Sequence, residues 1–422
     1  MKKATLSVLA AVLLLPALAA AQPAGEKKAS PVSAVQRHAL TANVAEYYFT
    51  LRVGSGPYDR IGVHRVVKET APNRPVRASR AVFLAPGDIW NFRAAFLTGA
   101  KPIPVFLAEN GIDVWGIDYR WTFVPASVTD LSFMRSWNLV QDARDLGVAI
   151  AAARATRAVT GSGPGKVFLL GWSRGGQIGY AYLNGETQLP PVLRQVKGFI
   201  PVDIYLKTDV PELRDKACQR RDATAAAIAG GTYAATSGGL ISAIGNAAVA
   251  DPNGPSAVVP GFNNHQAGLF VGEETFALLN GLEPVPVYHF TGGTVDANGV
   301  PTGLLYSNEQ DLFHFEIAAS PYQPNQELAD ADTSTCGRQA VPFDSHLGQI
   351  TVPVFYVGAG GGFGEYGLYT TTLLGSTDVT SLVVHKVPAA QRLSDYGHAD
   401  LFLAGDAQQL VWQPILSWLQ AH

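Results

Sequence analysis

The sequence predicts an α/β protein with a mostly parallel central sheet and helices on both faces. Short apolar runs alternate with helix-compatible segments along much of the 422-residue chain, and such alternation is typical of parallel sheets that are covered on both sides. The composition, 47% hydrophobic and 15% charged, is that of a globular protein rather than a disordered one. No repeat is visible, which argues against a solenoid or a propeller.

The elements of the first half follow from local patterns. Strands are expected over 47–53, 61–68 and 80–84, and the last of them ends in the turn signal APGD (85–88). A short helix is expected over 90–97 and a buried strand over 111–119 (GIDVWGIDY). Apolar residues at helical spacing predict a helix over 136–155. A strand over 166–170 (KVFLL), a helix after Ser173 and a strand over 196–202 (VKGFIPV) follow.

The alternation of strands and helices lapses between residues 207 and 344. It returns with strands at 352–357 and 381–387, and a helix over 407–420 closes the chain, with a kink or restart at Pro414. We interpret 207–344 as a cap inserted into one α/β core made of 46–206 and 345–422. A separate second domain is the alternative. Residues 22–45 are expected to form a loose leader.

The N-terminus is typical of a signal peptide spanning residues 1–21. Lys2 and Lys3 precede an apolar run from 6 to 18, and small residues at 19–21 offer a cleavage site. The run is too short to cross a bilayer, so we expect a secreted or periplasmic mature protein with no integral membrane segment. An N-terminal anchor that is never cut is the alternative.

Charge and cysteine usage restrict the partners and cofactors. Removing two lysines from 31 basic residues leaves 29 against 34 acidic ones, and without a basic stripe nucleic acid is not an expected partner. In an exported chain Cys218 and Cys336 are expected to form one disulfide; two unpaired thiols are the alternative. Metal ions and other cofactors are not expected, since no zinc-ligand spacing, P-loop or H-E-x-x-H motif is present and no G-x-G-x-x-G directly follows a predicted strand.

A candidate nucleophile lies in the segment GWSRG (171–175), which fits G-x-S-x-G. In this motif the serine occupies a strained strand-to-helix turn that requires small residues two positions away on either side. Ser173 would then lie over a helix N-terminus, where free amides favour a developing oxyanion. The apolar strand before the motif and the helix-compatible QIGYAYL after it support this interpretation. A glycine-rich turn without chemistry is the alternative.

A candidate general base lies in the segment YGHADLF (396–402), between the last predicted strand and the final helix. A catalytic triad needs an imidazole on a loop in this region, where Nε2 can reach the serine hydroxyl. His398 is the histidine in that position. Surface or structural roles are expected for the histidines of the predicted cap region, although contact of one with substrate stays open: His265, His289, His314 and His346.

With both motifs placed, the chain resembles the acid lipase branch of the α/β hydrolases. The resemblance rests on AENGIDVWGIDYRW (108–121), SFMRSWNLVQDARDLGVAI (132–150), GWSRGG (171–176) and YGHADLFLAGDA (396–407), which occur in the family's order. It covers residues from about 84 to 182 and from about 352 onward. It implies an α/β-hydrolase fold with a serine triad, and by position it makes the amides of Asp88 and Arg174 the oxyanion donors.

The triad acid departs from this family. The expected aspartate after the strand at 352–357 is replaced by Gly-Ala-Gly-Gly-Gly (358–362), and the nearest carboxylate is Glu365. Some haloalkane dehalogenases carry the acid five residues after a glycine that opens the strand following the nucleophile helix. GFIPVD (198–203) has that spacing, so Asp203 is the first choice and Glu365 the second. A strand-end carboxylate capping a turn is the alternative for Asp203.

The expected activity is hydrolysis of small-molecule carboxylic esters through an acyl-enzyme on Ser173, with His398 as base and Asp203 as its orienting acid. A serine nucleophile argues against dehalogenation and epoxide hydrolysis, which use an aspartate on this fold. A peptidase or amidase on the same scaffold, or a non-catalytic binding protein that keeps the fold, are the alternatives.

Overall fold

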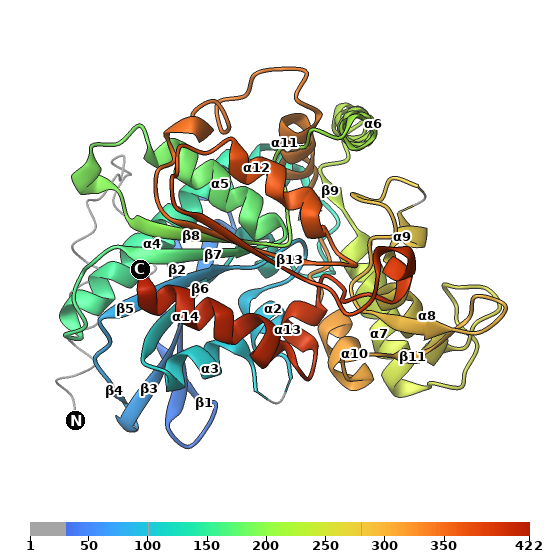
Figure 1. Ribbon diagram of the computed structural model, residues 1–422, viewed down its shortest axis with the longest axis horizontal. Helices are drawn as coiled ribbons and strands as arrows, with labels where there is room; N and C mark the ends of the chain where they lie inside the picture. Colours follow the sequence, from blue (N-terminus) through green and yellow to red (C-terminus); the bar gives the residue numbers. More distant parts are fainter. Residues whose placement is uncertain (1–30, 100, 280) are drawn as a thin grey trace.

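The computed structural model describes residues 31–99, 101–279 and 281–422, so the predicted signal peptide at 1–21 lies outside the described residues. Its centre is a ten-stranded sheet in the order β1-β2-β3-β6-β5-β7-β8-β13-β14, with β4 paired to β3 off this path (Figure 1). The strands are β1 (Gln36–Ala39), β2 (Val44–Arg52), β3 (Arg60–Ala71), β4 (Arg74–Pro75), β5 (Arg80–Ala85), β6 (Ile112–Asp118), β7 (Val167–Trp172), β8 (Val196–Val202), β13 (Val354–Ala359) and β14 (Val379–Val384).

The sheet is antiparallel at one edge and parallel elsewhere. β1, β2, β3 and β6 pair antiparallel, whereas β6, β5, β7, β8, β13 and β14 are parallel neighbours. Parallel strands end at the same edge of a sheet, and ligands of such folds bind there. The segments that follow β5, β7 and β8, which contain Asp88, Ser173 and Asp203, therefore come together at that edge.

Helices cover both faces of the sheet, as predicted. α4 and α5 pack on one face, and α2, α3 and α14 pack on the other (Figure 1). Side chains of β5 alternate between the two layers: Phe83 packs with the α4 and α5 side, and Leu84 with the opposite side. The helices outside the 207–344 segment are α2 (Phe92–Phe96), α3 (Ile103–Glu109), α4 (Leu139–Val159), α5 (Arg174–Glu186), α12 (Leu368–Thr372), α13 (Asp400–Leu403) and α14 (Gln413–Ala421).

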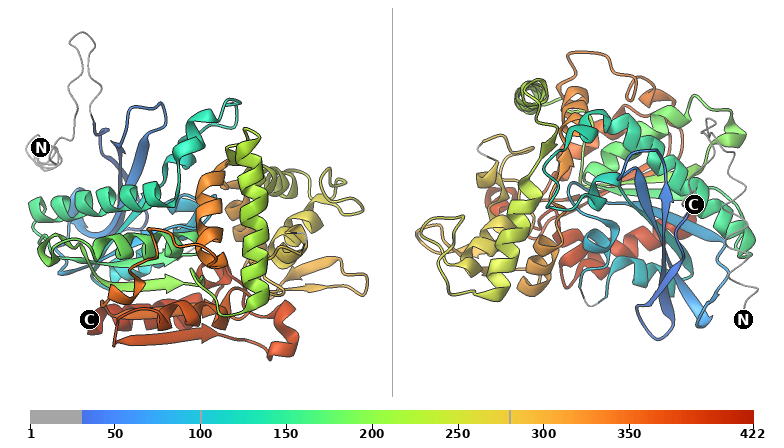
Figure 2. Two further views of the ribbon diagram at one scale, coloured as in Figure 1. Left: turned by 90° about the horizontal axis from the view of Figure 1, so that it is seen from above. Right: turned by 180° about the vertical axis from the view of Figure 1, so that it is seen from behind.

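Residues 207–344 add no strand to the large sheet. They lie together beyond one end of it, on the right of Figure 1, and both views of Figure 2 keep them on one side of the sheet. A disulfide joins Cys218 of α6 to Cys336 of α11, as predicted. The elements of this segment are α6 (Pro211–Ala229), β9 (Ala234–Ala235), α7 (Ser237–Ala250), α8 (Asn264–Glu273), α9 (Thr275–Leu278), β10 (Gly293–Val295), β11 (Pro301–Leu304), α10 (Glu309–Ile317), β12 (Gln323–Pro324) and α11 (Asn325–Cys336).

Two local expectations need correction. Residues 22–45 are not a loose leader throughout, because β1 lies within them and β2 begins at Val44; antiparallel pairing with β2 makes a strand of the polar QRHA segment. The helix α3 was not predicted, since IPVFLAE is short and carries Pro104, which the first turn of a helix tolerates. At the C-terminus a π-helical turn over Gln408–Trp412 precedes α14, with Pro414 in its first turn, so the predicted restart is present.

The part of the chain that the structure describes contains no helix that is both long and apolar enough to span a membrane.

Candidate active site

Ser173 occupies a strained turn between β7 and α5. Its backbone angles are φ 56° and ψ −129°, a region that costs free energy for any residue other than glycine and is concentrated at functional sites. The glycines two residues away permit the turn. A Cβ at Gly171 would lie 2.4 Å from the Gly175 carbonyl oxygen, and one at Gly175 would lie 2.2 Å from the Ala85 oxygen. The sequence prediction of a G-x-S-x-G turn between strand and helix therefore agrees with the backbone.

The loop after β5 lies directly against Ser173. A Cβ at Gly87 would come within 3.3 Å of the Ser173 Oγ, so the backbone there approaches the nucleophile closely. The next residues are Asp88 and Ile89, and Ile89 has a positive φ of 55°, which is rare for a β-branched residue. Within the described chain, the backbone amides of Asp88 and Arg174 donate no hydrogen bond. Both predicted oxyanion donors are thus free on the two segments that meet at Ser173.

The carboxylate of Asp88 is held by side chains rather than left beside the nucleophile. Arg174 Nε donates to Asp88 Oδ1 over 2.8 Å, and Gln323 of β12 donates to the same oxygen. The guanidinium also lies 3.6 Å from Glu327 of α11. Burial lowers the pKa of Arg174, but Asp88 and Glu327 more than reverse this and raise it. We call Asp88, Arg174 and Gln323 the oxyanion-loop clamp, because it joins the two segments that carry the free amides.

His398 is buried beside β7. It is 1% exposed, and its ring stacks on the indole of Trp172 with the centroids 4.8 Å apart. The Trp172 Nε1 donates to the His398 carbonyl oxygen over 3.3 Å. The predicted base therefore packs against Trp172, the residue that precedes the predicted nucleophile. Among the described residues, the Ser173 hydroxyl makes no hydrogen bond, and such bonds often form only when substrate is bound.

Asp203 contacts the predicted base directly. Its Oδ2 lies 2.6 Å from His398 Nδ1, and the aspartate is completely buried at the end of β8. Three backbone amides donate to the same carboxylate over 2.8 to 3.0 Å: Ala359, Phe363 and Gly364. A carboxylate that accepts several amide hydrogen bonds is fixed in one orientation, so it can select the imidazole tautomer in which Nδ1 carries the proton.

The glycine-rich segment after β13 surrounds the Asp203 carboxylate. Its sequence stood out for lacking a carboxylate, yet it folds around one that comes from β8. A Cβ at Gly362 would lie 1.9 Å from Asp203 Oδ2, so a larger residue would block the approach of the amides. In the sequence, the run of small residues indicates that this segment packs closely against another part of the chain. The folded structure is needed to show that this part is the Asp203 carboxylate.

The alternative acid, Glu365, contacts His385 rather than His398. Its Oε1 is 2.5 Å from Nε2 of His385, whose Nδ1 is 2.8 Å from Asp395. The Glu365 side chain is half exposed, and its histidine partner is not the predicted base. Of the four cap-region histidines, His289 is the one that reaches this area, where its backbone carbonyl accepts a hydrogen bond from the His398 amide over 3.0 Å.

Aromatic side chains that sequence reasoning did not single out surround the His398 imidazole. Besides Trp172, three rings lie with centroids 5.3 to 6.2 Å from it: Tyr288, Phe290 and Phe363. Two of them come from the 207–344 segment. No regular pattern marks these residues in the sequence, because they lie on irregular loops that only tertiary packing brings to the imidazole.

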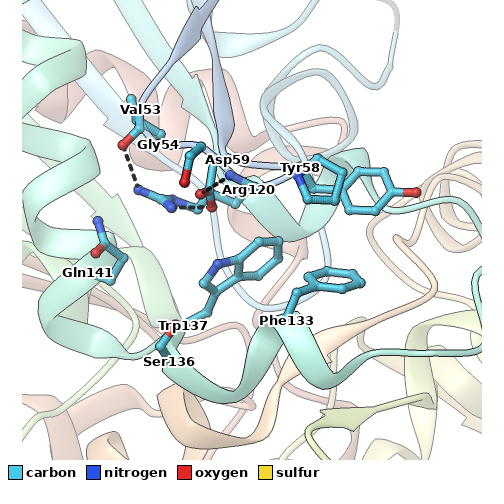
Figure 3. Close-up of a pocket in the computed structure, with 12 residues that line it drawn as sticks. Val53, Gly54, Tyr58, Asp59, Arg120, Phe133, Ser136, Trp137 and Gln141 are labelled. Carbon is cyan, nitrogen blue, oxygen red and sulfur yellow. Dashed lines mark hydrogen bonds and ion pairs between the residues drawn. The ribbon is translucent and has the colours of Figure 1, made fainter. Parts of the chain in front are cut away.

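A pocket of about 430 Å³ lies apart from these residues (Figure 3). It is lined by the 53–59 loop and by residues near the start of α4, among them Phe133 and Trp137. Its one cation, Arg120, is paired with Asp59 and Asp145 at 2.5 Å each, so it has no free charge to offer a ligand. None of Ser173, His398 and Asp203 lines this pocket.

Comparisons with known proteins identify the fold. No protein-family model and no curated protein sequence matches the chain. A solved structure described as a lipase candidate from Sulfolobus solfataricus is similar, with a TM-score of 0.60 and 19% identity over 90% of this chain and 95% of that one. The monoglyceride lipase of Saccharomyces cerevisiae covers 96% of this chain and 99% of its own, at 13% identity and a TM-score of 0.47.

The chain has the α/β-hydrolase fold. This follows from the mostly parallel sheet, from the helices on both of its faces and from the first of these likenesses. At such low identity the likeness establishes the fold alone, and the closer resemblance to acid lipases stays a prediction.

Proposed function

We propose that the protein is an exported serine hydrolase that cleaves carboxylic esters through a Ser173-His398-Asp203 triad. One observation carries the proposal: Asp203 contacts His398 over 2.6 Å, and the His398 ring packs on Trp172, the residue before a serine with the strained backbone of a nucleophile. Three backbone amides and the imidazole surround the Asp203 carboxylate and fix its orientation, as a triad acid requires.

The mechanism follows from the roles of these groups. Ser173 Oγ attacks the ester carbonyl carbon while His398 Nε2 takes the hydroxyl proton, and Asp203 stabilises the imidazolium that forms. The amides of Asp88 and Arg174 donate to the oxyanion; each such donor contributes roughly 3 kcal/mol to the transition state. Collapse breaks the ester C–O bond, and His398 returns the proton to the leaving alkoxide. Water, activated by His398, then releases the acid and regenerates the serine.

The 207–344 segment acts as a cap in this proposal. It lies beyond the sheet edge that carries Ser173, and it places two aromatic rings against His398. An apolar cover over the reacting groups excludes water and strengthens electrostatic stabilisation. Export is supported by the disulfide between Cys218 and Cys336, since such bonds persist in oxidising compartments.

The test is covalent labelling of the mature chain, residues 22–422, with a fluorophosphonate probe. We expect one label, on Ser173 by peptide mass spectrometry, together with hydrolysis of short-chain nitrophenyl esters. The S173A variant should lose both, and S376A, which alters an exposed loop serine, should keep both. Absence of labelling in folded protein would favour a non-catalytic binding protein. Faster turnover of peptide anilides than of esters would favour a peptidase.

A further inference from the structure

Tyr288 presents a buried phenol without a partner next to the predicted base. The residue is 6% exposed, and its ring centroid lies 5.3 Å from that of the His398 imidazole. Its hydroxyl forms no hydrogen bond to any other residue that the structure describes. Buried tyrosine hydroxyls usually find a partner, because leaving one unpaired costs free energy. The Tyr288 oxygen is not among the fully enclosed side-chain atoms that lack a partner, unlike the hydroxyl of Tyr180, so it remains accessible to water or to a bound ligand.

The backbone that carries Tyr288 is strained. The preceding residue, Val287, has a positive φ of 57°, which is an outlier for a β-branched side chain. Strain of this kind persists only where surrounding contacts enforce it. His289 supplies those contacts, since its Nδ1 lies 2.8 Å from the Val287 carbonyl oxygen and its Nε2 lies 3.0 Å from the Asp395 oxygen.

The same turn is fixed to the loops of the triad. The His289 amide donates to the Gly361 oxygen, and its carbonyl accepts from the His398 amide, both over 3.0 Å. A Cβ at Gly361 would lie 2.1 Å from the His289 ring, so the close packing depends on glycine. The neighbouring His289 therefore ties the turn that carries Tyr288 to the segments that contain His398 and Gly361.

Burial and nearby charge both act on the ionisation of the Tyr288 phenol. Burial raises the pKa of Tyr288 well above its ordinary value, and the charges of Asp203 and Asp88 raise it further. These carboxylates belong to the proposed triad and to the oxyanion loop. The phenol consequently keeps its proton at neutral pH and can only act as a neutral donor or acceptor of hydrogen bonds.

We propose that Tyr288 is a further catalytic residue, whose hydroxyl donates a hydrogen bond to an oxygen of the tetrahedral intermediate formed on Ser173. This inference rests on the proposed ester hydrolysis. It gives the Tyr288 hydroxyl, which has no protein partner in the described chain, a partner in the bound substrate. No proton leaves Tyr288 in the reaction. The hydrogen bond strengthens as negative charge develops on the ester oxygen, so it lowers the barrier more than it tightens ground-state binding.

Two other buried tyrosines show what a structural role looks like. Tyr205 donates its hydroxyl proton to the Pro284 oxygen over 2.7 Å. Tyr180 also has an unpaired hydroxyl, but it is completely buried within the helix α5, with its ring against Phe199. Tyr180 is therefore a matched control, since its change to phenylalanine removes the same atom from a position that substrate does not reach.

The experiment compares Y288F and Y180F with the wild type. For Y288F we expect kcat for a nitrophenyl ester to fall on the order of a hundredfold, KM to change less than about threefold, and the melting temperature to stay near that of the wild type. Inhibition constants of a trifluoromethyl ketone, which adds to the serine as a tetrahedral adduct, should rise in proportion to the fall in kcat/KM. Y180F should keep the wild-type values of kcat and inhibition.

The outcomes separate this inference from the function on which it rests. Wild-type protein that neither labels with fluorophosphonate nor hydrolyses esters would overturn both. An active wild type with a Y288F variant whose kcat falls less than threefold would overturn only the role of Tyr288. A rise in KM at unchanged kcat, or an equal loss in Y180F, would also overturn it, because a donor to the intermediate predicts neither.

Discussion

Two buried histidines of this protein differ in what their ring nitrogens contact. His64 of β3 lies between two carboxylates, with Nδ1 2.6 Å from Glu46 and Nε2 2.9 Å from Asp118. His398 contacts a single carboxylate through Nδ1. Burial alone lowers the pKa of His64, but Asp118 and Glu46 more than reverse this and raise it to about 9. His64 is therefore a permanent cation near neutral pH.

The comparison shows why burial and a carboxylate partner do not by themselves identify a general base. A base needs one ring nitrogen fixed and the other free to take a proton. His64 has both nitrogens occupied and holds strands β2, β3 and β6 together, since Glu46, His64 and Asp118 each belong to one of them. His398 has one nitrogen fixed by Asp203, and its other nitrogen makes no hydrogen bond within the described chain.

The largest expected effect is that of removing the charge which orients His398. The D203N variant should lose about 10⁴-fold in kcat, because the amide favours the wrong imidazole tautomer. Steady-state kinetics on nitrophenyl esters, with circular dichroism to confirm folding, measure this. A loss smaller than tenfold in folded protein would show that Asp203 is not the acid of the triad. The proposed difference between His398 as a base and His64 as a structural cation would then fail.

A second prediction concerns the stability contributed by His64. A folded-state pKa of about 9, above the ordinary value, means stabilisation that is complete below about pH 6.5 and is lost as pH rises through 9, amounting to about 3 kcal/mol. Urea unfolding at pH 6, 7.5 and 9 should show this decline in the wild type and a flatter profile in H64Q.

The difference between wild type and H64Q is the informative quantity, because a buried carboxyl titrates over the same range. Burial raises the pKa of Glu327 to about 8, so ionising it at higher pH also lowers stability in both proteins. If the two profiles run parallel from pH 6 to 9, the charged state of His64 contributes nothing and the histidine is neutral.

A smaller effect is expected from the oxyanion-loop clamp. D88N keeps the shape of Asp88 but loses the charge that Arg174 and Gln323 hold. We expect about a tenfold lower kcat at unchanged KM, because charge-assisted hydrogen bonds of this kind are worth about 1.5–3 kcal/mol and only part of that fixes the free amide. A change confined to KM would indicate that the clamp shapes substrate binding instead.

The smallest effect is expected from E365Q. Glu365 contacts His385 in a half-exposed position, so kcat should stay within about twofold of the wild type. This variant is the matched carboxyl-to-amide control for D203N. A loss in E365Q comparable to that in D203N would favour Glu365, the second choice from the sequence, as the acid of the triad.

Local patterns predicted the parts of the site that depend on neighbours in sequence. The strand, turn and helix around Ser173 form one continuous segment, and Asp203 directly follows a strand with a diagnostic spacing. The environment of Asp203 was not predictable, because its amide donors come from residues 359–364, about 160 positions away.

Other features escaped prediction because their cause is tertiary. The β1 segment is polar and forms a strand only through pairing with β2. Tyr288 lies in a strained turn that no local motif marks, and its significance appears only through its distance from His398. Residues whose role depends on chain segments far apart need the folded structure to be found.

The most direct test of the triad is a crystal structure of the mature protein after inactivation with a fluorophosphonate. We expect phosphorus bonded to Ser173 Oγ, the phosphonyl oxygen accepting the amides of Asp88 and Arg174, and His398 Nε2 within hydrogen-bond distance of the adduct while Nδ1 still contacts Asp203. An adduct on another residue, or an imidazole turned away from the phosphonyl group, would contradict the account.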